Sequence, residues 1–303
     1  MAVVVPPGLE AQRALGPRWA TWLDGLPRLA ADVLDEWGLT IDADDGTPRH
    51  GFCSLVLPVL TDDGVPAALK LHLPDEESEH EALALQRWGG DGAVRLLRAD
   101  PRRFLLLLER LHPTDLRDHW DLEACEIVAG LYGRLHVAAP PQLRPLTGYV
   151  ERWTEGLAAL PRDAPVPHRL VEQAVGLGRS FAADDASTGR MIHGDLHYEN
   201  VLAADREPWL AIDPKPVNGD PHYEVAPLLW NRWDELAHDV RGGVRRRFET
   251  VVDAAGLDED RARDWVVVRM MHNALWELED AERRPLDRDY LTMCVTLAKA
   301  VQE

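Results

Sequence analysis

The chain has 303 residues, 46% of them hydrophobic and 28% charged, and its 33 basic and 52 acidic residues give a formal net charge of −19. This composition is that of a globular protein, and the length suffices for two lobes or domains. The acidic charge excludes nucleic acid and anionic lipid as expected partners and favours a small cationic ligand, although acidity can also serve solubility alone.

Segments that would direct or anchor the chain are not evident in the sequence. No apolar run approaches the length of a membrane span, and the first ten residues lack the basic and long apolar regions of a signal peptide. The three cysteines, Cys53, Cys125 and Cys294, are scattered and have no metal-ligand spacing. We therefore expect a cytoplasmic protein without disulfides, either a monomer or a dimer.

The first part of the chain predicts a helix followed by a small antiparallel sheet. Residues 9–38 carry apolar positions at three- and four-residue spacing, with Pro27 near a helix start and Gly38 at a helix end. Residues 52–73 hold two apolar runs joined by the turn signature "TDDG", which predicts a hairpin. The remaining elements are a helix over 77–90 and strands within 93–100 and 102–111.

The pattern after residue 114 is mainly helical, and only residues 191–216 interrupt it, with the short strands "VLAA" and "WLAID". The predicted helices cover 121–138, 166–183, 221–238, 241–256, 258–283 and 287–302. The expected organisation is a sheet-containing N-terminal lobe over 1–108, a hinge over 109–113, and a helical C-terminal lobe over 114–303.

The interrupting segment collects residues suited to phosphate chemistry. Asn200 and Asp213 flank the predicted hairpin, and their amide and carboxylate oxygens are ligands that Mg²⁺ prefers. Asp195, on the loop before the hairpin, could orient or deprotonate a substrate hydroxyl. A plain loop and hairpin is the alternative, and zinc fits poorly because the histidines lack the i, i+4 pair of a zinc peptidase.

Residues 193–200, "HGDLHYEN", match the H-x-D-x-x-x-x-N catalytic loop of kinase-like phosphotransferases, and "IDP" over 212–214 stands where protein kinases carry D-F-G. The "HGDLH" form resembles aminoglycoside and choline kinases. Further stretches resemble the streptomycin 6-phosphotransferases of actinomycetes, a group often placed with hydroxyurea kinases. Nearly the whole chain takes part in this resemblance, including "GGDGAVRLL", "LLLERL", "HYENVLAA", "REPWLAIDP", "GDP" and "NALWELEDA".

The resemblance implies an α+β, bilobal protein-kinase-like fold with a small β-sheet N-lobe and a larger helical C-lobe. It implies that Asp195 is the catalytic residue and that Asn200 and Asp213 hold Mg²⁺. His193 would support the loop by hydrogen bonding and would not act as a base.

The same resemblance implies an ATP site. Lys70, on a predicted strand, would bind the α- and β-phosphates, paired with Glu81, with Glu79 as the second choice. His197 is expected either to face phosphate or to brace the loop. The residues expected at the hinge that holds adenine are Glu109, Arg110 and Leu111.

Two features modify this assignment. The glycine-rich phosphate loop of protein kinases is absent, since "GTPRHGFCSLVL" contains only Gly46 and Gly51. Lysine occurs only at positions 70, 215 and 299, and this scarcity favours a specific role for Lys70. Lys215 could touch phosphate or only balance nearby acids, and the predicted site does not include it.

A candidate substrate face lies near the C-terminus. Asn273, Trp276, Glu277 and Asp280 share one side of a predicted helix, and an aromatic ring with two carboxylates suits a guanidinium or ammonium group. The alternative is an amphipathic helix with its tryptophan in the core and its acids in water. Glu224, one turn inside another predicted helix, is assigned to the same substrate group.

The resemblance implies transfer of the ATP γ-phosphoryl group to a hydroxyl of a small cationic molecule, first an aminocyclitol such as streptomycin, in antibiotic resistance or self-protection. The alternatives are a kinase for an amino sugar, a cationic peptide antibiotic or hydroxyurea, and a nucleotide-binding pseudokinase module. A pseudokinase predicts the loss of a metal ligand or of the strand lysine, and neither is lost. The missing glycine-rich loop and A-P-E segment disfavour a protein kinase.

Overall fold

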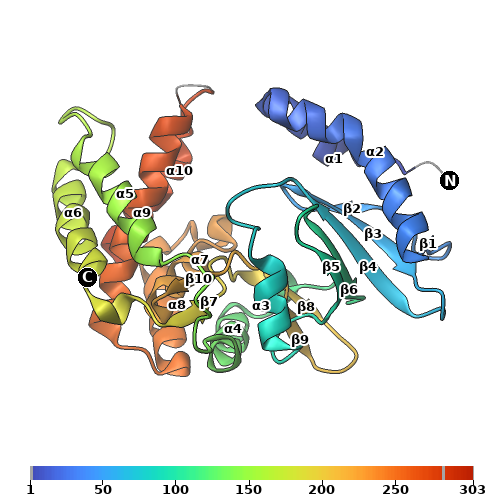
Figure 1. Ribbon diagram of the computed structural model, residues 1–303. Helices are drawn as coiled ribbons and strands as arrows, with labels where there is room; N and C mark the ends of the chain where they lie inside the picture. Colours follow the sequence, from blue (N-terminus) through green and yellow to red (C-terminus); the bar gives the residue numbers. More distant parts are fainter. Residues whose placement is uncertain (1–2, 282–283, 303) are drawn as a thin grey trace. The chain divides into compact units, whose positions relative to one another are not determined.

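The structure is a computed structural model that describes residues 3–281 and 284–302 (Figure 1). The chain divides into two compact units, one formed by residues 1–112 with 204–206 and the other by residues 113–203 with 207–303. The first is built on an antiparallel sheet and the second mainly from helices. This composition confirms the predicted α+β fold of two lobes.

The sheet of the first unit has the strand order β1-β3-β4-β6-β5, and β2 also pairs with β3. All pairs are antiparallel, and the predicted hairpin forms with Leu55 opposite Leu71 and Val56 opposite Lys70. The strands are β1 (Thr40–Ile41), β2 (Arg49–His50), β3 (Ser54–Leu60), β4 (Pro66–His72), β5 (Leu96–Asp100) and β6 (Leu105–Glu109).

One face of this sheet is covered by α2 (Pro17–Trp37), whose buried residues recur every three or four positions. Leu69 and Leu71 of β4 face this core, and because strand side chains alternate, Lys70 and His72 point to the opposite face. On that opposite face lies α3 (Glu81–Trp88), which ends at Gly89 in the left-handed conformation as predicted. The core therefore fixes which side of the sheet presents Lys70.

The helix predicted over 9–38 is divided, and its start was misplaced. It consists of α1 (Pro7–Glu10), a 3-10 turn η1 (Ala11–Leu15) and α2, which begins at Pro17. Pro27 lies inside α2, where it cannot donate a backbone hydrogen bond, so the neighbouring apolar contacts maintain the helix there. Gly38 ends α2 with φ +65°, as expected for a C-terminal glycine.

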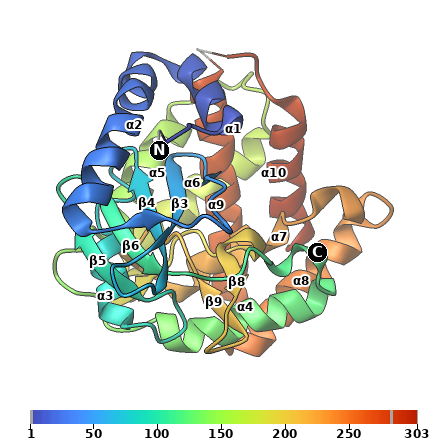
Figure 2. The same ribbon diagram turned by 90° about the vertical axis from the view of Figure 1, so that its right-hand side faces the viewer.

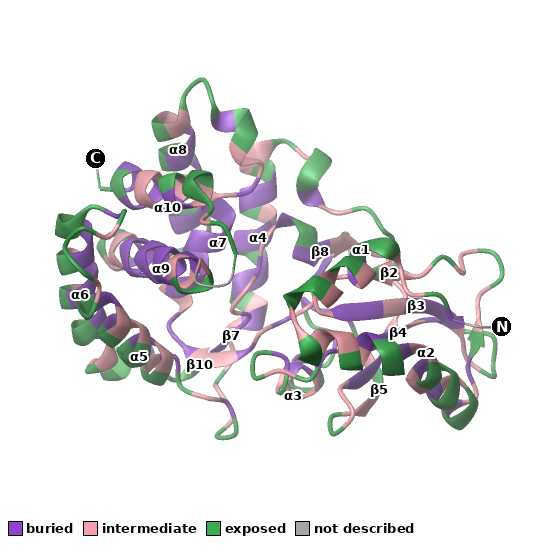
Figure 3. Cartoon of the chain, turned by 90° about the horizontal axis from the view of Figure 1, so that it is seen from above, coloured by how far each residue is buried: buried purple, intermediate pink, exposed green. Residues whose placement is uncertain are grey.

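The second unit is organised around α9, which is largely buried (Figure 3). It packs against α5, α6 and α10, and α9 and α10 lie side by side in Figure 2. Its helices are α4 (Asp121–Leu135), α5 (Leu146–Ala158), α6 (His168–Ala182), α7 (Val225–Leu229), α8 (Val240–Ala255), α9 (Glu259–Asp280) and α10 (Arg288–Ala300). In the described part of the chain, no helix is both long and apolar enough to cross a membrane.

Two helical predictions in this unit need correction. The helix expected over 221–238 is interrupted, because Arg232 adopts the left-handed conformation with φ +48°. The segment instead forms η5 (Pro221–Glu224), α7 and η6 (Trp233–Leu236). Of the helix expected over 258–283, the last two residues lie outside the described part of the chain.

Two short ladders frame the segment singled out in the sequence. β7 (Arg190–Ile192) pairs with β10 (Val217–Gly219), and β8 (Val201–Ala203) pairs with β9 (Trp209–Ala211). The loop 193–200 connects β7 to β8, and residues 212–216 connect β9 back to β10. The two loops are therefore held next to each other by strands at both ends.

Candidate active site

Asn200 and Asp213 lie just outside the paired ends of the β8–β9 hairpin. Val201 pairs with Ala211, and the N–H of Ile212 donates to the carbonyl of Asn200 at 2.9 Å. The hairpin thus brings an amide and a carboxylate side chain, thirteen positions apart in the sequence, to neighbouring points of the backbone.

The amide group of Asn200 is oriented by the loop 193–200, at whose end it stands. Its Nδ2 donates to the carbonyl of Asp195 at 2.8 Å and lies 3.1 Å from Nε2 of His197. Because Nδ2 is bonded within the loop, Oδ1 is the atom of this amide group that could serve as a metal ligand. His197 therefore braces Asn200, and its contact with phosphate stays a prediction.

Asp213 has an unusual backbone for a residue with a side chain. Its φ of +57° places it in the left-handed region, which costs a non-glycine residue about 1 kcal/mol or more. Residues held in this way cluster at functional sites, where the surrounding structure maintains them. The conformation is consistent with a carboxylate positioned for a ligand.

Lys215, which the sequence-based site left out, lies in the neighbouring loop 212–216 and contacts the loop 193–200. Its Nζ lies 2.9 Å from Oδ2 of Asp195, and its backbone N–H donates to the carbonyl of His193 at 2.8 Å. The Asp195 side chain remains 21% exposed and that of Lys215 43% exposed. The scarcity of lysine was the signal that could have identified this residue.

Gly194 allows the two loops to approach each other. Its φ is +83°, and a Cβ added there would lie 2.2 Å from the carbonyl oxygen of Lys215. No other residue fits this position without displacing the backbone. The glycine between His193 and Asp195 is thus required by the packing that brings Lys215 to Asp195.

His193 has the structural role predicted for it. Its Nε2 donates to the carbonyl of Ile212 at 2.9 Å, and its Nδ1 accepts from the N–H of Asp195 at 3.3 Å. Burial lowers the pKa of His193, so the ring is neutral and can donate on one side and accept on the other.

Glu224 was assigned to substrate, but its side chain is fully buried against the loop 193–200. It accepts from the N–H of Gly194 at 2.5 Å, from the N–H of His193 at 3.2 Å, and from Nε2 of His136 at 2.8 Å. Burial alone would raise the pKa of Glu224, but these bonds and the neighbouring histidines outweigh it, so the pKa lies below its usual value. With no exposed surface, Glu224 is a positioning residue for the loop.

Arg269, on α9, supports the same loop and was not identified from the sequence. It donates to the carbonyl of Gly194 at 2.9 Å and to that of Tyr223 at 3.2 Å, and it stacks over the Tyr223 ring. A buried arginine on a helix of mixed polarity has no local signal that distinguishes it from a surface arginine.

In the sheet unit, Lys70 and Glu81 form a buried ion pair. Nζ of Lys70 lies 2.7 Å from Oε1 and 2.8 Å from Oε2 of Glu81, and both side chains are at most 5% exposed. Glu81, the first choice from the sequence, joins Lys70 between strand β4 and helix α3. Burial also excludes the alternative that Lys70 extends into solvent.

Comparisons with known proteins agree with these motifs. A family model described as aminoglycoside/hydroxyurea antibiotic resistance kinase matches residues 38–281. A streptomycin 6-kinase of Streptomyces glaucescens is 42% identical, with 99% of this chain and 97% of that protein covered. The chain belongs to this kinase family. It is a small-molecule O-phosphotransferase of the aminoglycoside phosphotransferase type.

A further relative and a solved structure are also similar to this chain. A hydroxyurea phosphotransferase of Kitasatospora aureofaciens is 41% identical, over 92% of this chain and 81% of that protein. The solved structure of a spectinomycin phosphotransferase is 13% identical but superposes with a TM-score of 0.58, covering 91% of this chain and 98% of that one. This likeness confirms the predicted kinase-like fold.

The predicted hinge residues of the kinase use their side chains within the sheet unit. Glu109 accepts from Arg206 and from the N–H of Arg95, both at 2.7 Å. Arg110 donates to the carbonyls of Val59 at 2.7 Å and Ala67 at 2.9 Å, while Leu111 is the second residue after β6. Their assignment to adenine stays a prediction and concerns the backbone, because these two charged side chains are engaged elsewhere.

Half of the residues predicted to form the substrate face of α9 are buried inside the protein. Asn273 and Glu277 are buried, and Glu277 pairs with Arg284 and accepts from the N–H of Asp287 at 2.6 Å. Trp276 is half-buried, with its ring 4.8 Å edge-on from that of Trp153, and Asp280 is exposed. The four residues thus differ in burial, and of these four only Trp276 and Asp280 have surface that a ligand could contact.

Proposed function

We propose that this kinase transfers the γ-phosphoryl group of ATP to a hydroxyl of streptomycin or a related aminocyclitol, and that it serves antibiotic resistance or self-protection. The observation that carries the choice of acceptor is the 42% identity with a streptomycin 6-kinase over nearly the full length of both proteins. The acidic charge of −19 supports a cationic acceptor, because streptomycin carries guanidino groups.

Asp195 is the residue that would act on the acceptor. Its Oδ2 is held by Lys215 at 2.9 Å, and we assign the other carboxylate oxygen to the substrate hydroxyl, which it orients and from which it accepts the proton. His193 and Asn200 hold the backbone of Asp195 from two sides, through bonds of 3.3 Å and 2.8 Å. A fixed carboxylate of this kind lowers the entropic cost of aligning the hydroxyl with phosphate.

The donor set of the hairpin fits Mg²⁺. Asn200 offers Oδ1, since its nitrogen is bonded to the loop, and Asp213 offers a carboxylate from the other end of the hairpin. Hard oxygen ligands in small number are what Mg²⁺ accepts when phosphate completes its coordination. The ion would supply charge neutralisation at the transferred phosphoryl group.

The sheet unit would hold the nucleotide. We assign the α- and β-phosphates to Lys70, which Glu81 fixes through both carboxylate oxygens, and adenine to the backbone of residues 109–111. For the cationic substrate we retain Trp276 and Asp280, through a cation–π contact and an ion pair. Glu224, Asn273 and Glu277 are proposed to act through the residues they position.

Hydroxyurea is the second candidate acceptor, favoured by the 41% identity with a hydroxyurea phosphotransferase. The two acceptors are separated by measuring ADP release from ATP with streptomycin, with hydroxyurea and with neither, followed by mass spectrometry of the product. We expect streptomycin to stimulate ADP release and to gain one phosphoryl group. Stimulation by hydroxyurea alone would replace the first acceptor with the second.

The catalytic assignment is tested with Asp195→Asn, which preserves the shape of the side chain. We expect kcat to fall by about 10³-fold, within the range for loss of a general base, while ATP still binds. Omission of Mg²⁺ should abolish turnover of the unaltered kinase. A nucleotide-binding pseudokinase would instead bind ATP and give no phosphorylated product under any of these conditions.

A further inference from the structure

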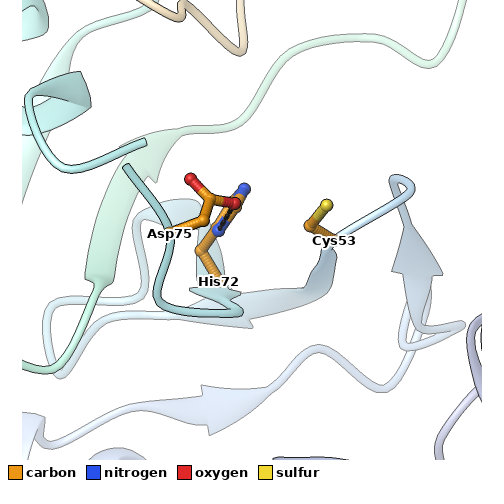
Figure 4. A group of neighbouring side chains, drawn as sticks. All are labelled: Cys53, His72 and Asp75. Atoms are coloured by element: carbon orange, nitrogen blue, oxygen red, sulfur yellow. Dashed lines mark ion pairs between the residues drawn. The ribbon is translucent and has the colours of Figure 1, made fainter. Parts of the chain in front are cut away.

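A cluster of three potential metal ligands lies in the sheet unit, whereas Asn200 and Asp213 belong to the other unit. Cys53 precedes β3, His72 ends β4, and Asp75 follows in the loop that leads to α3. One ligand atom from each lies within 4.8 Å of the others, and Figure 4 shows the side chains gathered at this end of the two strands.

The backbone and neighbouring groups fix these side chains. The N–H of Leu73 donates to the carbonyl of Cys53 at 2.8 Å, which joins the start of β3 to the end of β4. Nδ1 of His72 lies 2.7 Å from the carbonyl of Leu73 and donates to it, so Nε2 carries the lone pair of the neutral ring. Histidines that ligate metals are typically oriented by such a bond from their other nitrogen.

The carboxylate of Asp75 is oriented in the same way. Its Oδ1 accepts from the N–H of Ser78 at 2.8 Å and from Oγ of Ser78 at 2.7 Å, and its Oδ2 lies 3.7 Å from Nδ1 of His72. Ser78 is itself buried. Two of the three potential ligands therefore have supporting bonds that place them without any ion.

We propose that Cys53, His72 and Asp75 bind one divalent cation of the zinc class, with a fourth position open to water. A thiolate, an imidazole and a carboxylate form a donor set that zinc accepts and that Mg²⁺, which prefers oxygen alone, does not. Ligand distances of about 2.0–2.3 Å in a tetrahedron place the donor atoms about 3.3–3.8 Å apart, so the three side chains would move closer together when the ion binds.

The site would stabilise the region around the nucleotide-binding ion pair. His72 follows Lys70 by two residues on the same face of β4, and the loop holding Asp75 and Ser78 leads directly to Glu81. An ion there would join the residue before β3, the end of β4 and the entry to α3. Because binding requires the folded arrangement, Zn²⁺ should raise the unfolding temperature of the kinase.

The test uses the full chain and Co²⁺ as a spectroscopic probe for Zn²⁺. At Co²⁺ equimolar with protein, we expect a thiolate-to-cobalt charge-transfer band and the strong visible absorption of a tetrahedral site, both removed by Zn²⁺ but not by excess Mg²⁺. The other cysteines should not contribute, because burial raises the pKa of Cys125 to about 11 and that of Cys294 to about 12. Absence of the charge-transfer band would overturn the proposal.

Variants assign the band to these residues. Cys53→Ser should remove it, Asp75→Asn should weaken Co²⁺ binding, and Ser78→Ala should weaken it by about 10-fold through the supporting bond. His50→Gln, a nearby exposed histidine outside the cluster, is the matched control and should bind normally. A band that survives in Cys53→Ser, or is lost in His50→Gln, contradicts the site. If Cys53→Ser does not fold, Asp75→Asn decides with the same readout.

Discussion

Nζ of Lys215 lies 2.9 Å from Oδ2 of Asp195, although the two residues stand on opposite sides of the β8–β9 hairpin in the sequence. The approach depends on Gly194, which lets the Lys215 carbonyl pass where a side chain would otherwise lie, and on the bond from the Lys215 N–H to His193. The acid assigned to the acceptor hydroxyl is thus held by a cation from the loop after Asp213.

Replacing Lys215 by Met should lower kcat by about 10- to 100-fold, because a charge-assisted hydrogen bond contributes about 1.5–3 kcal/mol to fixing Asp195. Steady-state kinetics with saturating ATP and acceptor would measure the loss. Lys215→Arg keeps the charge and should recover part of the rate. An unchanged kcat in Lys215→Met would exclude a role for this contact in turnover.

Variants of the Lys70–Glu81 pair should affect stability and activity differently. Glu81→Leu removes the carboxylate that lies against the buried ammonium of Lys70 and should lower the free energy of unfolding by about 3 kcal/mol or more. The double variant Lys70→Met/Glu81→Leu removes both charges and should regain most of that stability while remaining inactive, because the phosphate-binding cation is gone. Urea denaturation and turnover assays on the same samples test both statements; an active double variant would contradict the assignment of Lys70.

Gly194→Ala should nearly abolish turnover. The added Cβ meets the Lys215 carbonyl at 2.2 Å, so the loop must move away from Lys215. Gly256→Ala is the control, since Gly256 also has a positive φ but a Cβ there meets nothing within 4 Å. The control should lose only about 1 kcal/mol of stability and keep its rate. Equal activity of the two variants would show that the close approach is dispensable.

The free energy of unfolding should fall in mild acid because His272 is buried. Burial, with the nearby charge of Arg269, lowers the pKa of His272 to about 3. The unfolded histidine has a pKa of about 6.5, so between these values the unfolded chain binds a proton that the native state does not, and the free energy of unfolding falls as pH falls. At about pH 5 this linkage costs about 2 kcal/mol.

His272→Phe should therefore flatten the decrease in unfolding free energy between about pH 7 and about pH 5, by about 2 kcal/mol. Urea denaturation at the two pH values provides the comparison, and the change in slope is informative even if the variant is less stable at both. His238→Phe removes an exposed histidine and serves as the control. Identical slopes in His272→Phe and the unaltered kinase would refute the linkage.

Local signals predicted the elements well where one residue type decides the backbone. Gly38 and Gly89 end their helices in the left-handed conformation, and the turn "TDDG" joins β3 to β4. The break at Arg232 has no such signal, because its left-handed conformation depends on tertiary contacts such as the bond of its side chain to the carbonyl of His119. Helix α5 was also missed, since its glycines obscure the helical pattern.

The positions of side chains in the candidate site were predictable only where the spacing along the chain determines them. Asn200 and Asp213 were placed by the hairpin that separates them. Whether an acid in a predicted helix faces a ligand or the protein depends on partners outside that helix: Glu224 meets His136, 88 positions away, and Glu277 meets Arg284, beyond the end of α9. The helical period is the same in both cases, so the sequence could not distinguish a substrate contact from a buried brace.

The scarcity of lysine has a practical consequence for handling this kinase. Lys70 is buried in an ion pair, Lys215 is partly exposed beside Asp195, and Lys299 is exposed on the last helix. Amine-directed labelling, surface methylation or coupling to a resin has few side chains to modify, and one of the accessible amines, that of Lys215, adjoins Asp195. A sample modified through its amines should therefore be checked for turnover, because a change at Lys215 would also disturb Asp195.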